Sequence, residues 1–483
     1  MLSRGKMTRN SETNYDVCIV GAGPGALACL SAIREPFSLD TLNPSQIHRA
    51  NHSFKLHHQL KVCVIDPSGS WMHNWGKNFD NLSIEYLRSP ALAHPNMFDM
   101  NALLAYAIAN GREDELIESG CFGIKCLRSL GQSQIGLWKL PSNKLFYDFC
   151  KDLASSLHHD MVKGKITNIQ KLEDGGNTIF KMTTDNDRVK SFVSKNVILA
   201  MGPVGRPVVP TQLLSCSRYF LWNQPEVFTS LSRTNGKKVL VVGGGLTAVQ
   251  AALKVIKLDH HCVLLSRRPL IERHFDIDVK WFDSRIIDKC KTTFHYLPIE
   301  DRLASLKEVR DGGSVPPLYM RQVEEVERRQ RLTRVVGEMD YLGETQSGTF
   351  NIKFGKKNTQ QFDSIIIACG VENKPDMDPL ICKIQEQWPV QWRGGFPVVN
   401  EELQWEDDLN LFVVGGLASL SIGPDGGNLM GIRRGAQIIA NTLECRCWLR
   451  KKVLTNVFDS LYYDDSESDT ESTSESDDDD AVQ

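Results

Sequence analysis

The sequence predicts an α/β fold with two similar parallel-sheet units, followed by an acidic tail. Three observations support it. A β-rich run, a glycine turn and an apolar helix-like run follow one another at 15–33, and the same succession recurs at 237–256. Each unit is matched by a later strand that ends in Ala-x-Gly, at 197–202 and 364–370. Strands that alternate with helices are typical of parallel sheets covered by helices.

The first glycine turn has the pattern of a dinucleotide-binding site. It contains Gly21, Gly23, Pro24, Gly25 and Ala26. Gly21 suits the tight turn, Gly23 lets the backbone approach a pyrophosphate, and Ala26 permits close helix packing, while the helix N-terminus offers free N–H groups. The acid expected to bind the ribose is Asp66, at the end of the strand 61–65. Its late position indicates a surface insertion at about 36–60.

The second glycine turn repeats this pattern with Gly243, Gly245 and Ala248. The next strand, 261–265, is followed by Arg267 and Arg268 where a site for NAD would place an acid. Guanidinium groups suit a 2′-phosphate, so the pattern favours NADPH. The alternative is that both arginines are ordinary solvated charges.

The two later strands carry small residues where the chain would pass close to a nucleotide. Ala200 and Gly202 end the first of them, and Ala368 and Gly370 end the second. Small residues permit such an approach. Their order around the two glycine turns supports two Rossmann-like, three-layer ββα dinucleotide-binding domains.

Two further segments are expected to lie near a flavin. The loop after Asp66 carries Trp71, His73 and Trp75, although both indoles also suit an ordinary core. A C-terminal glycine-rich stretch contains Asp425, Gly427, Asn428 and Leu429 and opens a helix. The N–H groups of that helix suit the flavin edge on which negative charge develops. Alternatively, Asp425 or Asn428 simply caps the helix.

Composition narrows the remaining possibilities. No apolar run is long enough for a membrane span, and no Cys-x-x-Cys or metal-ligand pattern occurs among the thirteen cysteines. We therefore expect no metal and a reducing, cytoplasmic location. The stretch 464–480 holds ten acidic residues and no Lys or Arg, which predicts a disordered tail that is phosphorylated, binds a partner or only aids solubility. No basic-aromatic cluster indicates a nucleic acid.

The motifs in this order resemble the two-dinucleotide-binding-domain flavoproteins. Segments 71–73, 86–90, 98–106 and 140–149 resemble their counterparts in the N-hydroxylating lysine and ornithine monooxygenases. This resemblance implies that NADPH reduces FAD, that oxygen adds to the flavin as a C4a-hydroperoxide, and that a nucleophilic, amine-like small molecule is oxygenated. It places Trp71, His73 and Arg88 near the flavin as the catalytic candidates.

The chain also departs from these relatives. The Phe-x-Gly-x-x-x-His signature of dimethylaniline-type and Baeyer–Villiger (class B) monooxygenases is absent before the second turn, and Leu246-Thr247 replaces the Gln-Ser of the N-hydroxylating enzymes. A looser similarity links the chain to the oxidative-stress-induced growth inhibitor proteins. An NADPH oxidase or quinone-type reductase, and a regulatory flavoprotein with incidental turnover, therefore stay as alternatives.

The expected organisation has five parts. They are a disordered leader at 1–13, an FAD-binding domain in two stretches at 14–230 and 365–450, an NADPH-binding domain at 235–364 that contains an inserted segment at about 280–334, and the tail at 460–483. The inserted segment either covers the active-site cleft or is a surface excursion. The oligomeric state is left open.

Overall fold

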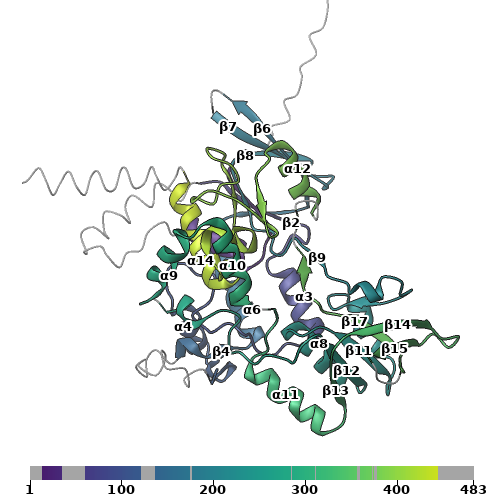
Figure 1. Cartoon of the computed structure of the whole chain (residues 1–483). Helices are drawn as coiled ribbons and strands as arrows, with labels where there is room; N and C mark the ends of the chain where they lie inside the picture. Colours follow the sequence, from purple (N-terminus) through teal and green to yellow (C-terminus); the bar gives the residue numbers. More distant parts are fainter. Residues whose placement is uncertain are drawn as a thin grey trace, which may run out of the picture.

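The computed structural model describes residues 14–34, 60–120, 136–174, 177–283, 285–310, 312–355, 359–372, 374 and 378–443 (Figure 1). The predicted leader, most of the insertion after the first helix, and the acidic tail lie outside these residues.

The first sheet combines strands from both ends of the described chain. Its order is β5-β2-β1-β8-β7-β6, and β21 also pairs with β8. Its strands are β1 (Asn14–Val20), β2 (Val62–Asp66), β5 (Asp160–Lys163), β6 (Ile166–Asp174), β7 (Asn177–Thr184), β8 (Ser191–Leu199) and β21 (Leu411–Val413). β1 runs parallel to β2 and β8, whereas β6, β7 and β8 form an antiparallel meander. The carboxyl ends of β1 and β2 therefore meet at one edge.

The second sheet is parallel and lies in another part of Figure 1, below and to the right of β6, β7 and β8. Its order is β10-β17-β11-β12-β13, formed by β10 (Phe220–Leu221), β17 (Ser364–Ile367), β11 (Lys238–Val242), β12 (His261–Ser266) and β13 (Leu332–Val336). A small antiparallel sheet packs beside it, made of β14 (Met339–Glu344), β15 (Phe350–Phe354) and β16 (Thr359–Phe362).

Twelve helices of the described residues connect or cover these strands. They are α1 (Pro24–Arg34), α3 (His73–Leu82), α4 (Ala102–Ala109), α6 (Asn143–Ser156), α7 (Pro225–Leu231), α8 (Leu246–Lys257), α9 (Ile287–His295), α10 (Ile299–Arg310), α11 (Pro317–Arg328), α12 (Pro379–Gln387), α13 (Ser419–Ile422) and α14 (Leu429–Thr442). Short elements are η2 (Glu113–Glu115), β3 (Leu116–Ile117), η5 (Gly136–Trp138), β4 (Leu140–Pro141), β9 (Arg206–Pro207), η6 (Thr211–Leu213), η7 (Val279–Trp281), β18 (Val371–Glu372), β19 (Trp392–Arg393), β20 (Phe396–Pro397) and η8 (Gly415–Ala418).

Strand alternation explains the layers around the second sheet. Val239 and Val241 of β11 belong to the buried cluster that contains the apolar residues of α8. Leu240 and Val242 belong to the opposite cluster, with Phe350 and the rest of the small antiparallel sheet. Because successive side chains of a strand point to opposite faces, one apolar run supplies both interfaces. The predicted three-layer ββα fold is confirmed.

The segment between β12 and β13 does not stay with the second sheet. Phe275, Trp281 and Phe282 are buried in the core cluster of the first sheet, and Phe275 and Phe282 pack against Trp138. Helices α9 and α10 contact α13, whereas α11 packs on α8. The connection 267–331, which contains most of the predicted insertion at about 280–334, therefore contacts both halves of the molecule. The domain boundaries themselves stay a prediction.

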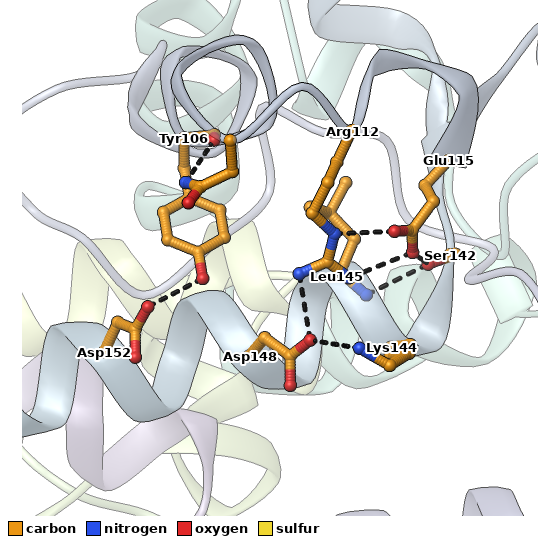
Figure 2. Close-up of polar contacts among 9 residues, drawn as sticks. Tyr106, Arg112, Glu115, Ser142, Lys144, Leu145, Asp148 and Asp152 are labelled. Carbon is orange, nitrogen blue, oxygen red and sulfur yellow. Dashed lines mark hydrogen bonds and ion pairs between the residues drawn. The ribbon is translucent and has the colours of Figure 1, made fainter.

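A polar network fixes α4 and η2 against α6 (Figure 2). Arg112 contacts Glu115 at 2.6 Å and Asp148 at 2.9 Å, and the Tyr106 hydroxyl donates to Asp152 at 2.7 Å. Ser142 caps α6 by accepting the Leu145 N–H at 2.9 Å, as N-cap serines commonly do. The network holds the N-terminus of α6, where Asn143 accepts a hydrogen bond from Trp75 of α3.

Candidate functional site

The first glycine turn joins β1 to α1 and is tight against the end of β8. Gly21 has φ 109°, and a Cβ there would lie 2.4 Å from the Ala200 carbonyl oxygen. No residue with a side chain fits this position. A Cβ at Gly23 would meet nothing within 4 Å, so the face of the turn is open. An open glycine face at a helix N-terminus fits a pyrophosphate.

Asp66 lies at the end of β2 and faces this turn. Its Oδ2 accepts the Ala22 N–H at 3.2 Å, and its Oδ1 accepts the Ser68 N–H at 2.8 Å. Its Oδ1 also accepts the Ser68 hydroxyl at 2.5 Å. A carboxylate can accept about four hydrogen bonds, so capacity for about one ribose hydroxyl group remains. Its role as the ribose ligand stays a prediction.

The aromatic loop after β2 has protein partners of its own. Trp71 is buried and its indole N–H donates to His159 Nε2 at 2.9 Å. Trp75 stacks on Phe79 and donates to Asn143 Oδ1 at 3.0 Å. His73 is exposed at the start of α3. Their predicted roles at a flavin stay untested.

The helix α14 begins beside the first turn. Asn428 is its N-cap and accepts the Met430 and Gly431 N–H groups at 3.2 and 3.3 Å, while a Cβ at Gly25 would lie 3.7 Å from Ile432 of this helix. Within the described part of the chain, the buried Asn428 Nδ2 and Ser419 Oγ have no hydrogen-bond partner. An unsatisfied buried donor is costly unless a ligand accepts from it.

Asp425 is occupied by another side chain. It is fully buried and forms a two-pronged ion pair with Arg434, whose guanidinium lies over the Trp281 ring. Burial raises the pKa of Asp425, and the hydrogen bonds from Arg434 oppose that shift. Of the two predicted caps, Asn428 is the one that caps α14. Gly427 and Leu429 stand on either side of this cap.

The second glycine turn repeats the backbone geometry of the first. Gly243 has φ 151°, and a Cβ there would lie 2.3 Å from the Ala368 carbonyl oxygen and 2.8 Å from Ala248. The Gly243 N–H donates to Leu265 at 2.9 Å, just as the Gly21 N–H donates to Ile65 at 2.8 Å. The paired Ala-x-Gly strands therefore perform the same steric role in both units.

The face of the second turn is covered, unlike that of the first. A Cβ at Gly313 would lie 2.5 Å from the Gly245 Cα, so the two backbones are in contact. A Cβ at Gly312 would lie 2.2 Å from Arg268 Nη2. Arg267 and Arg268 are otherwise exposed after β12, where a 2′-phosphate would lie.

Arg88 anchors the covering segment. Its guanidinium donates to the carbonyls of Arg273, His274 and Ser314 at 3.1 to 3.3 Å, and to Ser314 Oγ at 2.8 Å. Burial lowers the pKa of Arg88, opposed by Asp276. These three partners lie between β12 and β13, and the predicted place of Arg88 near a flavin stays untested.

Sequence reasoning missed the roles of Gly312, Gly313, Arg88 and His159. The Gly-Gly pair marks a turn but does not say which surface the turn meets. The described residues contain no cluster of three or more His, Cys, Asp or Glu arranged to hold a metal ion. None of the helices in the described ranges combines the length and apolarity that a bilayer crossing requires.

A mixed first sheet, assembled from both ends of the described chain, and a parallel second sheet carry equivalent glycine turns. Together they define a two-dinucleotide-binding-domain flavoprotein oxidoreductase. Residues 15–282 match the family described as pyridine nucleotide-disulphide oxidoreductase, and the chain belongs to that family. The predicted class of an oxidoreductase that uses FAD and a nicotinamide dinucleotide is confirmed at this level.

A relative of known name matches only part of the chain. Ferredoxin–NADP reductase 3 of Lysinibacillus sphaericus (strain C3-41) is 26% identical over 136 residues, which is 28% of this chain and 38% of the relative. The match thus spans less than two fifths of that protein.

Solved structures share the fold over nearly the whole chain. Ornithine hydroxylase (PvdA) from Pseudomonas aeruginosa has a TM-score of 0.65 at 16% identity, covering 90% of this chain and 100% of its own. L-lysine 6-monooxygenase from Pseudomonas syringae has a TM-score of 0.61 at 17% identity, covering 89% and 99%. Bacillithiol disulfide reductase from Bacillus cereus scores 0.50 at 15% identity, covering 89% and 99%. At these identities the likeness concerns the fold.

Proposed function

We propose that this protein is an FAD-dependent NADPH oxidoreductase that works as a monooxygenase on a nucleophilic, amine-like small molecule. The observations that carry the FAD site are the open face at Gly23 and the unpartnered Asn428 Nδ2. Asp66 would hold the ribose, the α1 N-terminus the pyrophosphate, and Asn428 a polar edge of the flavin.

When bound, FAD supplies the redox chemistry, accepting a hydride from NADPH and delivering electrons to oxygen. The chain contributes binding, orientation and exclusion of water. Trp71 after β2 and Trp75 in α3 pack in the core of the first half, and α14 packs against the helix that follows the first turn. No acid–base pair is required of the protein in such chemistry.

The cysteines favour oxygen over disulfide exchange. The sequence has no Cys-x-x-Cys pair, and the nine cysteines within the described ranges are free. Burial raises the pKa of Cys29 to about 12 and raises that of Cys369. Since the thiolate is the reactive form, these thiols are poor nucleophiles. Free, buried thiols also suit the reducing cytosol as the place of action.

A reductase is the second candidate. The family includes disulphide oxidoreductases by description, and the Lysinibacillus relative is a ferredoxin–NADP reductase. In this alternative the same two sites pass electrons from NADPH to oxygen, a quinone or a protein acceptor.

One assay separates the two candidates. NADPH consumption, oxygen uptake, peroxide release and product formation are measured across a panel of amines and sulfides. A monooxygenase yields about one oxygenated product per NADPH consumed with at least one panel member, and little peroxide. Stoichiometric peroxide with every compound, or turnover only with artificial acceptors, would exclude the monooxygenase and support the reductase.

The Gly23→Ala variant tests in the same assay whether the first glycine turn holds FAD. Its methyl group enters the open face without touching protein, so the fold should persist while the FAD pyrophosphate is obstructed. We expect a variant with normal circular dichroism, little bound FAD and no NADPH oxidation. Activity at the wild-type level would show that the first turn does not hold the flavin.

A further inference from the structure

We propose that residues 312–314 form a gate over the second dinucleotide site, which must lift before NADPH binds. The proposal rests on the proposed function. It starts from the contrast between equivalent glycines. The face of Gly23 is open, whereas Gly313 lies directly against Gly245, at the position where the first turn would receive a pyrophosphate.

The gate contacts both parts of the site that NADPH would need. Gly313 covers Gly245, and Gly312 packs on the guanidinium of Arg268. The pyrophosphate would require the first surface and the 2′-phosphate the second. A nucleotide therefore cannot occupy the site while the segment keeps both contacts.

The gate is held by hydrogen bonds at one end and consists of two exposed glycines at the other. Val315 is held by its N–H to Ile271 at 2.8 Å and by the Arg273 N–H to its carbonyl at 3.0 Å, and Arg88 holds Ser314. Gly312 has φ 73°, and both glycines are exposed on their outer side. Lifting them would therefore uncover no apolar core, so opening costs little.

Arg88 connects the gate to the first half of the molecule. It extends from the segment after α3 and reaches Ser314, 226 positions away in the chain. FAD would bind in that half. The segment that carries Arg88 would therefore connect the flavin site to the gate. Because only open molecules bind NADPH, the apparent affinity equals the affinity of the open state multiplied by the fraction of molecules that are open.

The test uses Gly313→Ala as a wedge. Its methyl group would lie 2.5 Å from the Gly245 Cα, and the backbone at Gly313 does not have a positive φ, so alanine is acceptable only with the gate lifted. Isothermal titration of NADP⁺ into the FAD-loaded protein should show binding at least about fivefold tighter than in the wild type. Ala304→Ser, on the exposed face of α10, also adds one heavy atom and should change nothing.

A second variant and a second readout protect the test from misfolding. Ser314→Ala removes the Oγ partner of Arg88 and should tighten NADP⁺ binding by a smaller factor. Hydrogen exchange without nucleotide should quicken at residues 312–314 in both variants, while the β11 amides stay protected. Retained FAD absorbance shows that the fold is intact.

The outcomes separate the gate from the function beneath it. Unchanged or weaker NADP⁺ binding in Gly313→Ala, with wild-type binding intact, overturns the gate and leaves the NADPH site standing. No NADP⁺ binding in any variant, including the wedge, overturns the NADPH site and the gate with it.

Discussion

His94 is a fully buried imidazole that lacks a second hydrogen-bond partner. Its Nε2 lies 3.1 Å from the Met100 carbonyl, and Nδ1 has no partner among the described residues. Burial lowers the pKa of His94 to about 3, and the nearby Arg433 adds to the shift. The ring is therefore neutral in the folded protein, and its protonation favours the unfolded chain.

This difference makes stability depend on pH in one direction. An unfolded histidine takes up a proton near pH 6.5, whereas folded His94 does so only near pH 3. The free energy of unfolding therefore falls by about 1.4 kcal/mol for each pH unit below 6.5. Between pH 6.5 and 5.0, the free energy of unfolding of the wild type should fall by about 2 kcal/mol more than that of His94→Gln. Urea unfolding at both pH values measures this difference.

The exposed His73→Gln variant is the control for this titration. This variant measures how much the replacement of an exposed histidine changes the pH profile of stability. Parallel profiles for wild type and His94→Gln would mean that His94 is protonated in the folded state.

At the scale of single elements, the N-cap of α14 combines two tasks. Asn428 Oδ1 caps the helix, and Asn428 Nδ2 is left for a ligand. Asn428→Ala should lower the stability of the FAD-free protein by about 1 kcal/mol. Asn428→Asp keeps the acceptor but replaces the donor with negative charge, so its stability should hold while FAD binding weakens.

Thermal melting and the quenching of flavin fluorescence on titration measure these two effects separately. The argument requires that the aspartate variant differ from the wild type in FAD affinity and from the alanine variant in stability. An aspartate variant that binds FAD like the wild type would assign Asn428 a capping role alone.

Elements differ in how well the sequence predicts them. The glycine turns were predictable, because Gly21 and Gly243 lie where a side chain would collide with a strand of the same unit. The capping alternative for Asn428 was also predictable, because a cap is a contact within four residues. The gate was not, because the contact of Gly313 with Gly245 depends on how a long insertion returns to the sheet.

At the scale of the molecule, the segment between β12 and β13 joins two halves that sequence reasoning treated separately. Phe275 and Trp281 are apolar residues of that segment, and their pattern does not state which core they enter. The structure places them in the first half, so the link between the halves follows from tertiary packing. Arg88 is the polar part of the same link.

Replacing Arg88 should therefore lower the stability of the protein by weakening the contact between the two halves. Arg88→Met keeps most of the side-chain volume but leaves the carbonyls of Arg273, His274 and Ser314 without their shared donor. Hydrogen bonds to a charged group contribute about 1.5 to 3 kcal/mol, and relief of the buried charge offsets part of this, so we expect a loss of about 2 kcal/mol. Arg328→Met, on the exposed side of α11, should lose less than about 0.5 kcal/mol.

Hydrogen exchange distinguishes a broken link from general destabilisation. In Arg88→Met, exchange should quicken at residues 271–274 and 312–315, whose backbones meet where Val315 bonds to Ile271, while β1 and β11 remain protected. Uniform acceleration across both sheets would mean that Arg88 serves global packing. Wild-type stability together with unchanged exchange would mean that the apolar contacts of the inserted segment alone hold the halves together.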